Sequence, residues 1–288
     1  MELNLTQWVN DTDEDYVDIR KAMHIVLLAI GSSSRLSSMM ALKGGVLMAI
    51  QYANTRFTTD LDFSALQNPE DVDPDALRDE LNQSLLSAEV ELISYNISCR
   101  VQKIKKQPKA FEAASFPSLN ITIGYAKKDN PGAIKRLQSG SAADAISIDY
   151  SFNEITGELA EVILENEEKI KVYSFPSLMA EKFRSILQQV VRNRKRRQDV
   201  YDLHHLISKY ATHSESEKIQ VYNLLLEKSA DKGIDEYLER LALQNSEIRS
   251  RCEEGFEDLI YEDVEEISFE DAYLIVQEYF ESLPWECS

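Results

Sequence analysis

The sequence predicts an α+β protein, in which a small mixed sheet with flanking helices precedes a helical domain. Two observations carry this prediction. Several stretches before residue 153 alternate polar and apolar side chains, as half-buried strands do. From Phe175 to the C-terminus, apolar residues instead recur at helical spacing. We therefore expect a first domain over residues 1–173 and a second over residues 174–288.

The composition is that of a folded, acidic chain. Of 288 residues, 43% are hydrophobic, nine are glycine and seven are proline, and the formal net charge is −19. A field of that sign repels nucleic acid, so any contact with it needs a local basic surface. No apolar run nears the roughly 20 residues that cross a bilayer, and the acidic N-terminus does not resemble a secretory signal. Three scattered cysteines without metal-ligand spacing indicate reduced thiols in the cytoplasm.

The chain begins with a long amphipathic helix, which we predict over residues 14–38. A short strand at Met40–Leu42 then meets Gly44 and Gly45, and a helix is predicted from Val46 to about Tyr52. Backbone N–H groups at such a turn, together with the helix N-terminus, can bind an anion. Two glycines alone are also explained by a plain tight turn.

Asp60 and Asp62 lie in TTDLDFSAL, whose alternation predicts a strand. At a two-residue period both carboxylates project from the same face of the sheet. Neighbouring carboxylates repel each other unless a cation lies between them, so this pair predicts a site for a hard divalent metal. Two exposed aspartates on an edge strand remain the alternative.

A helix is predicted over Pro74–Leu86, followed by neighbouring strands at Tyr95–Lys103 and Ser118–Tyr125. Lysines cluster between these strands and just after them: Lys103, Lys105, Lys106, Lys109, Lys127 and Lys128. They indicate either a solvated hairpin or a surface that contacts a phosphate backbone.

A further strand, Ala145–Phe152, carries Asp149 on the face opposite its apolar residues. Asp149 is either a solvent-exposed acid or a third carboxylate, which could bind the metal or take a proton from an attacking hydroxyl. Acids from neighbouring strands hold the two ions in two-metal phosphoryl chemistry.

The second domain opens at Phe175 with an apolar helical stripe that Lys182 borders, where a lysine can also simply extend to solvent. The next loop, Arg192–Arg197, is the strongest basic cluster of the chain. Asp199 and Asp202 follow on the next helix, three residues apart and so roughly on one side. Acids in a first turn also favour the helix dipole without any catalytic role.

The last segment is strongly acidic and has no lysine or arginine after Arg251. Apolar residues interleave with the acids, which predicts packed helices rather than a disordered tail. The acids are Glu253, Glu254, Glu257, Asp258, Glu262, Asp263, Glu265, Glu266, Glu270 and Asp271. We expect this surface to repel RNA. If it has a partner, we expect a basic protein surface or the chain's own basic loop.

The order of these motifs resembles the AbiEii/AbiGii toxin-like nucleotidyltransferases, the toxins of type IV toxin–antitoxin systems within the DNA polymerase β-like superfamily. The matching motifs are KGG-x-L, RF-x-x-DLDFS, IDYSF, AEK and R-x-D-x-YDLHHL, spread over residues 40–210. The resemblance implies a nucleotidyltransferase-like sheet followed by a helical domain. We expect the active site in the cleft between the two domains, to which the helical domain contributes Lys182 and Asp199.

The resemblance also implies roles for individual residues. Asp60 and Asp62 would hold magnesium, and Lys182 would neutralise charge on the phosphates. Asp199 would be a second catalytic acid, with Asp202 as the competing assignment. The residues that would bind the nucleotide are Lys43, Gly44, Gly45 and Thr59.

Asp149 matches the superfamily's third-strand carboxylate only in position and context. The chain departs from the family pattern at Val46, where a small hydroxyl residue usually follows the glycines, and at Gln198, which separates Arg197 from Asp199. Neither change removes a metal ligand. Val46 removes one possible hydrogen bond to a phosphate, and Gln198 changes the spacing between the basic residue and Asp199.

The expected reaction is a magnesium-dependent transfer of a nucleoside monophosphate from a nucleoside triphosphate (NTP) to an acceptor. By resemblance the acceptor is an RNA 3′ end, such as that of tRNA, and the result is growth inhibition in phage defence, countered by a cognate antitoxin. The RNA-binding candidates are Arg192, Arg194, Lys195, Arg196 and Arg197. The alternatives are transfer to a protein hydroxyl and an inactive binding module of the same fold; an Asp-x-Asp glycosyltransferase would need a repeating βα pattern that the chain lacks.

Overall fold

The computed structural model describes residues 3–164, 167–259 and 267–285 and divides into two compact units. The first unit contains residues 1–51, 58–154 and 159–173, and the second contains residues 52–57, 155–158 and 174–288. Two short segments, 52–57 and 155–158, thus belong to the second unit although they fall within the first 173 residues.

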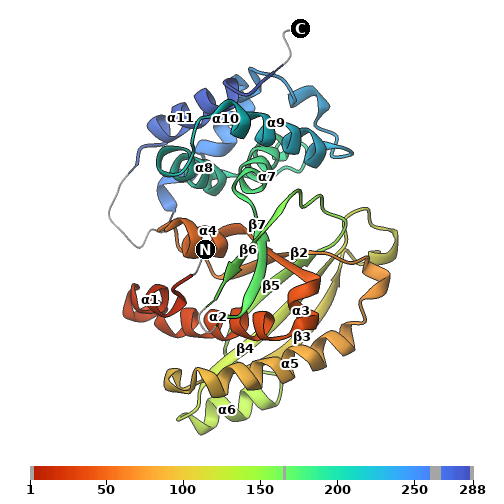
Figure 1. The fold of residues 1–288 in the computed structure, drawn as a ribbon, viewed down its shortest axis with the longest axis vertical. Coiled ribbons are helices and arrows are strands. Elements are labelled where there is room, and N and C mark those ends of the chain that lie inside the picture. Colours follow the sequence, from red (N-terminus) through yellow and green to blue (C-terminus); the bar gives the residue numbers. More distant parts are fainter. Residues whose placement is uncertain (1–2, 165–166, 260–266, 286–288) are drawn as a thin grey trace. The chain divides into compact units, whose positions relative to one another are not determined.

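The first unit is built on one mixed seven-stranded sheet with the order β3-β4-β5-β2-β1-β7-β6 (Figure 1). Its strands are β1 (Met40–Lys43), β2 (Asp60–Ala65), β3 (Ile97–Gln107), β4 (Ser118–Lys127), β5 (Asp144–Ser151), β6 (Leu159–Ile163) and β7 (Lys169–Tyr173). β1 runs parallel to β7, and β2 runs parallel to β5, whereas the other neighbouring pairs are antiparallel. The α+β prediction is confirmed.

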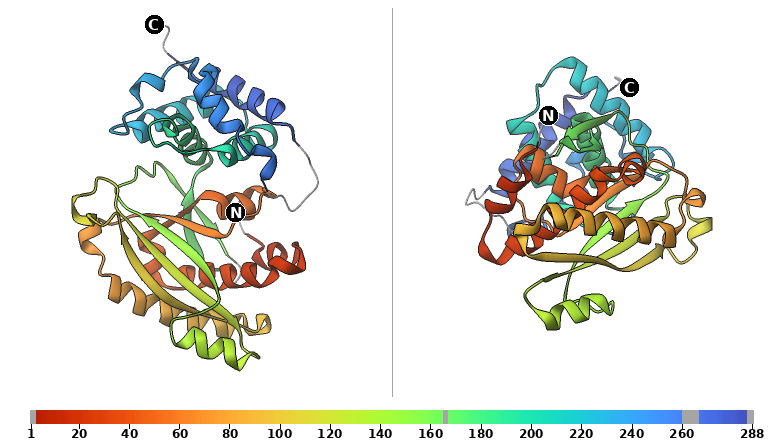
Figure 2. Two further views of the ribbon diagram at one scale, coloured as in Figure 1. Left: turned by 180° about the vertical axis from the view of Figure 1, so that it is seen from behind. Right: turned by 60° about the horizontal axis from the view of Figure 1, so that its bottom comes forward.

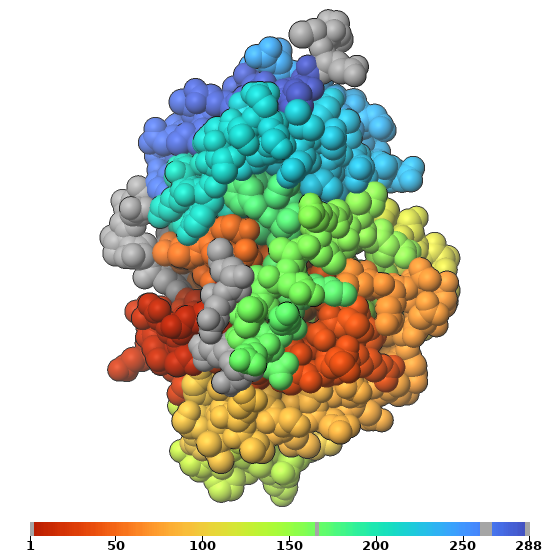
Figure 3. Space-filling model, viewed as in Figure 1, coloured from red at the N-terminus to blue at the C-terminus, as the bar shows by residue number. Residues whose placement is uncertain are grey.

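The helices of the first unit are α1 (Leu5–Asn10), α2 (Glu14–Ser32), α3 (Ser34–Met39), α4 (Gly44–Tyr52), α5 (Pro74–Glu91) and α6 (Pro131–Gln138). The single helix predicted over residues 14–38 is wrong, because Ser33 adopts an extended backbone and its side chain caps α3 by accepting the Leu36 N–H. α2 and α5 pack on one face of the sheet (Figure 1 and Figure 2). α5 and α6 also form part of the surface in Figure 3.

The two faces of the sheet differ in chemistry because strand residues alternate between them. Apolar side chains of the central strands, such as Leu61, Phe63 and Ile148, are buried in the core. The residues between them are polar and partly exposed, including Asp60, Asp62 and Asp149. The acids therefore lie on the opposite face from the apolar core.

The second unit is helical, as predicted for the chain after Phe175. Its helices are α7 (Phe175–Gln188), α8 (Arg197–Lys209), α9 (Glu215–Ser229), α10 (Ser246–Glu253) and α11 (Phe269–Glu281). Residues 260–266, which include four of the acids predicted to lie on packed helices, fall outside the described residues. α7 packs against α8 and α9, and α11 packs against α8.

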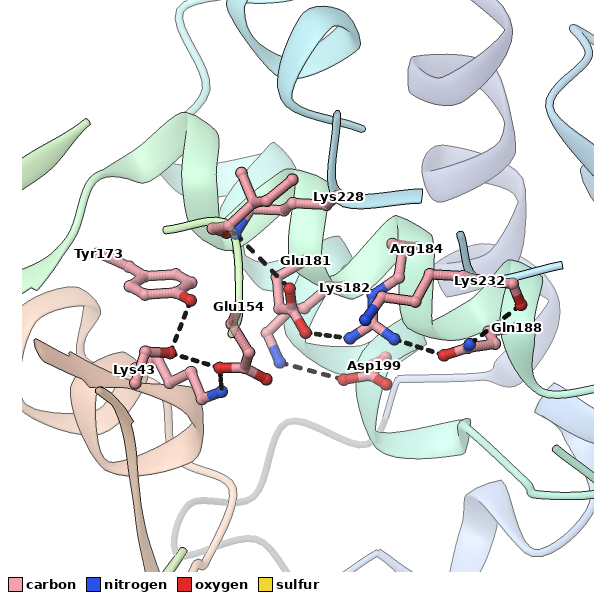
Figure 4. A network of polar contacts seen from close by, with 12 residues as sticks. Lys43, Glu154, Tyr173, Glu181, Lys182, Arg184, Gln188, Asp199, Lys228 and Lys232 are labelled. Atoms are coloured by element: carbon pink, nitrogen blue, oxygen red, sulfur yellow. Dashed lines mark hydrogen bonds and ion pairs between the residues drawn. The ribbon is translucent and has the colours of Figure 1, made fainter. Parts of the chain in front are cut away.

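Buried polar groups fix segment 155–158 within the second unit. Lys228 of α9 is buried, donates to the Ile155 carbonyl and lies 3.6 Å from a carboxylate oxygen of Glu181 (Figure 4). The Ser177 hydroxyl of α7 donates to the Thr156 carbonyl at 2.5 Å. Since a buried ammonium must keep its partners, this segment is held firmly beside α7 and α9.

Candidate active site

The turn between β1 and α4 brings a carboxylate against a glycine. Gly44 has φ of +74°, in the left-handed region that favours glycine. A Cβ built on Gly44 would lie 2.1 Å from Oδ2 of Asp62. Two separate reasons therefore favour glycine at this position. Its backbone is left-handed, and the Asp62 carboxylate occupies the space that a Cβ would fill. This carboxylate lies at the N-terminal end of α4, where the helix dipole favours negative charge.

Three of the predicted acids share one face of the sheet. Asp60 and Asp62 are two residues apart on β2, and Asp62 is directly paired with Asp149 of the parallel strand β5. Burial and the charge of Asp149 raise the pKa of Asp60 above its ordinary value. The carboxylates thus destabilise one another when ionised, and a cation beside them would relieve the repulsion.

The donor chemistry of these acids fits a hard cation such as magnesium, because all of their ligand atoms are carboxylate oxygens. Within the described parts of the chain, no group of three or more histidine, cysteine or acidic side chains is placed so that it could hold a metal ion. Asp60 and Asp62 would hold such a cation by themselves and leave its other coordination positions to water or substrate, as magnesium sites that bind nucleotides commonly do.

Lys43, the residue before the glycines, is held by a partner that the sequence did not indicate. Its ammonium forms an ion pair with Glu154, and the same Glu154 oxygen accepts the Ser64 hydroxyl (Figure 4). The Ser64 hydroxyl lies 2.8 Å from that of Tyr173. These contacts connect β1, β2 and β7 to the residues just after β5. Lys43 and Glu154 are 111 residues apart, so no local spacing could reveal the pair.

In the second unit, Lys182 of α7 lies between the two aspartates of α8. Its ammonium donates to Asp202 at 2.6 Å and to Asp199 at 3.2 Å, and all three residues are buried. Burial by itself lowers the pKa of Lys182, but the charges of Asp202 and Asp199 outweigh burial and raise it. Lys182 is therefore a cation at neutral pH.

Asp202 is saturated by hydrogen bonds. The Arg56 guanidinium donates to both of its oxygens, at 3.0 and 3.1 Å, and the Asn54 amide donates at 3.0 Å. Burial raises the pKa of Asp202, but the charges of Arg56 and Lys182 hold it far below its usual range. Arg56 belongs to the RF-x-x-DLDFS motif, but its position in that motif does not reveal that it pairs with Asp202.

Asp199 differs from Asp202 in having one oxygen available. Oδ1 accepts from Lys182, whereas Oδ2 has no hydrogen-bond partner among the described residues and lies 3.6 Å from a guanidinium nitrogen of Arg196. A buried carboxylate oxygen without a hydrogen bond is uncommon in folded proteins and calls for an explanation, such as a catalytic role or an ordered water.

Further contacts anchor the segment before β2 to α8. Nε2 of His205 lies 2.6 Å from the carbonyl oxygen of Tyr52, and the hydroxyl oxygens of Thr55 and Tyr201 are 3.0 Å apart. With Asn54 and Arg56, these residues hold segment 52–57 within the second unit. Thr59, predicted to bind the nucleotide, is exposed immediately before β2.

Acids of the chain itself engage part of the predicted RNA-binding loop. Lys195 forms an ion pair with Glu254, and Arg197 lies 3.9 Å from Asp258. Two acids of the acidic segment thus pair with the basic loop, which is one of the two partners considered for that segment. Burial and the neighbouring arginines, Arg194 first among them, lower the pKa of Arg192, so positive charge is concentrated at this side of the loop.

The predicted site residues thus fall into two groups. The first unit brings together Lys43, Gly44, Gly45, Asp60, Asp62 and Asp149. The second unit brings together Lys182 and Asp199 with Asp202. That both groups line one cleft, and that these residues are the catalytic ones, stays a prediction.

Solved structures resemble the fold at low sequence identity. JHP933 from Helicobacter pylori is 15% identical, with a TM-score of 0.50 over 94% of this chain and 92% of that one. A second H. pylori structure, of a protein assigned as a nucleotidyltransferase, is 16% identical with a TM-score of 0.47 over 93% and 94% of the two chains. An antigenic nucleotidyltransferase-like protein from Paracoccidioides brasiliensis is also 16% identical, with a TM-score of 0.40 over 84% and 94%.

No curated protein matches the chain. None of the helices in the described ranges has the length and apolar character needed to span a membrane. A family described as the nucleotidyl transferase AbiEii toxin of type IV toxin–antitoxin systems matches residues 26–279, nearly the whole chain. The chain therefore belongs to the AbiEii family of type IV toxins, and it is a nucleotidyltransferase.

Proposed function

We propose that this nucleotidyltransferase transfers a nucleoside monophosphate from a magnesium-bound NTP to the 3′ hydroxyl of an RNA such as tRNA. The observation that carries the proposal is the Asp62 carboxylate packed against Gly44, beside Asp60 and Asp149. It joins an anion-binding turn to a carboxylate group that favours a cation, and a nucleotide with its metal needs both.

In the transfer step, the acceptor oxygen forms a bond to the α-phosphorus while the bond to the β-phosphate oxygen breaks. Pyrophosphate leaves with that electron pair, and a carboxylate takes the hydroxyl proton. We assign the proton to Asp149, which is exposed and directly opposite Asp62. Magnesium, held by Asp60 and Asp62, would neutralise charge on the triphosphate.

Basic groups of each unit are the candidates for stabilising the phosphates. Lys43 and the backbone of Gly44 and Gly45 are the candidates in the first unit, with Thr59 beside them. Lys182, which stays protonated between its two aspartates, supplies a fixed positive charge in the second unit.

The surroundings of the two aspartates on α8 support Asp199 over Asp202 as the second catalytic acid. Asp202 already accepts from three side chains, so it serves to hold Lys182 and the segment before β2. Asp199 keeps an oxygen that can accept a hydrogen bond from substrate.

We further propose that the toxin acts in the cytoplasm, in defence against phage, and that a cognate antitoxin counters it. Cys99 and Cys252 are free and buried, which agrees with a reducing compartment.

Incubation with each α-³²P-labelled NTP, magnesium and total cellular RNA tests the reaction, with Asp60→Ala as the control. We expect label on RNA with the wild type and none with the variant. Label on protein instead would keep the chemistry and replace the acceptor by a protein hydroxyl. No label on either, from a folded sample, would favour an inactive binding module.

A further inference from the structure

The polar face of the sheet carries two continuous rows of side chains that run from the acids to the edge strand β3. Residues paired across neighbouring strands project from the same face, so a row can be read from the strand register. The first row is Lys43, Asp62, Asp149, Asn120 and Lys105, on β1, β2, β5, β4 and β3. The second row is Asp60, Ser147, Thr122 and Lys103.

The middle of both rows is neutral and polar. The Asn120 amide donates to the Ser147 hydroxyl at 2.7 Å, which ties the two rows together. Asn120, Ser147 and Thr122 are all partly exposed. Their hydroxyl and amide groups can bond sugars and phosphates without adding charge.

The edge of the rows is basic. Lys103 and Lys105 are exposed, and no carboxylate of the described residues lies within ion-pair distance of either. Other lysines near this hairpin are paired: Lys106 with Glu112 at 2.9 Å, Lys127 with Asp18 at 2.8 Å, and Lys128 with Glu89 at 3.1 Å. In a chain of net charge −19, two lysines left unneutralised on the face of the acids mark a site for an anion.

The spacing suits a chain of phosphates rather than one small anion. β3 lies three strands from β2, which at about 4.8 Å per strand separates Lys105 from Asp62 by roughly 14 Å. A single phosphate near the acids cannot reach both ends of a row, whereas a strand of nucleic acid can.

We propose that this polar face binds the acceptor as a single strand of nucleic acid, whose upstream phosphates contact Lys103 and Lys105. The 3′ end of the strand lies toward Asp60 and Asp149. Between the two ends, Asn120, Thr122 and Ser147 form hydrogen bonds with the sugar–phosphate backbone. The direction of the strand rests on the proposed function, whereas its binding to the lysines rests on the rows and their charge.

The test measures binding of a fluorescent, single-stranded oligoribonucleotide of mixed sequence by anisotropy, without NTP, across a series of salt concentrations. The variant is Lys103→Gln with Lys105→Gln, which removes two charges from exposed strand positions and leaves polar side chains there. The control is Lys135→Gln with Arg136→Gln, which removes the same charge from exposed positions on α6. Thermal unfolding of each variant checks that the fold is retained.

We expect the β3 variant to bind about tenfold more weakly, with a salt slope reduced by about 1.4, since each phosphate contact of a single strand contributes about 0.7. The α6 control should change affinity by less than about twofold. Absence of binding by the wild type, or equal losses in both variants, would overturn the proposal.

Activity measurements separate this inference from the proposed function. If transfer occurs, the β3 variant should raise the KM for RNA and leave the KM for NTP and the kcat unchanged. An unchanged KM for RNA would overturn the acceptor subsite while the transferase stands. If the wild type binds RNA through the lysines but transfers nothing, the subsite stands and the proposed reaction fails.

Discussion

Two aspartates three residues apart on α8 have opposite surroundings, and this difference decides what each can do. Asp202 is fully buried and accepts from Asn54, Arg56 and Lys182, whereas Asp199 keeps one oxygen without a hydrogen bond among the described residues. A spacing of three residues puts both on one side of the helix but says nothing of their partners.

Asp202→Asn should therefore damage the fold, and Asp199→Asn should damage activity. Loss of the Asp202 charge leaves Arg56 and Lys182 with one fewer buried partner, at a cost of about 3–5 kcal/mol in unfolding free energy. Asp199→Asn should cost only about 1 kcal/mol, because Lys182 keeps Asp202, while transfer falls at least about 100-fold. Urea denaturation and labelled-NTP assays measure both, and reversed effects would exchange the two roles.

Asp60 offers a second test at the residue scale. Its pKa is raised in the folded protein, so its ionised form is less favourable there than in the unfolded chain, and its contribution to stability falls as pH rises through that pKa. Asp60→Asn should consequently raise the melting temperature of the metal-free protein at pH 7 by about 1–2 °C.

Magnesium should stabilise the wild type more than the Asp60→Asn variant, which scanning calorimetry can measure. A lower melting temperature of the metal-free variant would contradict the unfavourable ionisation of Asp60. The same response to magnesium in both proteins would contradict a cation site there.

At the scale of elements, the strand–turn–helix of β1 and α4 depends on one glycine. Gly44→Ala must place a side chain in a left-handed conformation, at about 1–2 kcal/mol, and also displace the Asp62 carboxylate. Gly140 provides the matched control, because its φ of +78° is similar and nothing lies within 4 Å of a Cβ built there.

Gly140→Ala should lose stability by about the backbone cost and retain full activity. Gly44→Ala should lose more stability than the control and most of its nucleotidyl transfer. Chemical denaturation and activity assays compare the two variants. Equal losses of stability and of nucleotidyl transfer would mean that the contact between Gly44 and Asp62 does not contribute to activity.

At the scale of the whole molecule, the contacts of Asp202 with Arg56 and Lys182 predict how the unfolding free energy depends on pH. The pKa of Asp202 is depressed in the folded state, so its contribution is complete above the unfolded value of about 3.9 and is lost as pH falls toward the folded value. Unfolding free energy should thus decline below about pH 4.

Arg56→Gln removes the largest charge that depresses this pKa. The variant should be less stable at pH 7, and its unfolding free energy should vary less between pH 4 and pH 2. Urea titrations at several pH values measure the slope, and an unchanged slope would assign the acid sensitivity to other carboxylates.

The sequence by itself determined the features that depend on local order. The Asp-x-Asp period fixed a shared face for Asp60 and Asp62, the two glycines marked the turn before α4, and helical spacing marked the second domain. The motif order also identified the family, since each motif is a short run of residues. These features need no knowledge of what lies beside them in space.

Only the tertiary structure decided which distant groups meet. The ion pair of Lys43 with Glu154 joins residues 111 apart, and that of Arg56 with Asp202 joins residues 146 apart. The two short strands β6 and β7 were not predicted, and the register that places Asp149 opposite Asp62 could not be read from either strand alone. Register and long-range pairs are set by packing of the whole core, which is why periodicity gives the face of a residue but not its partner.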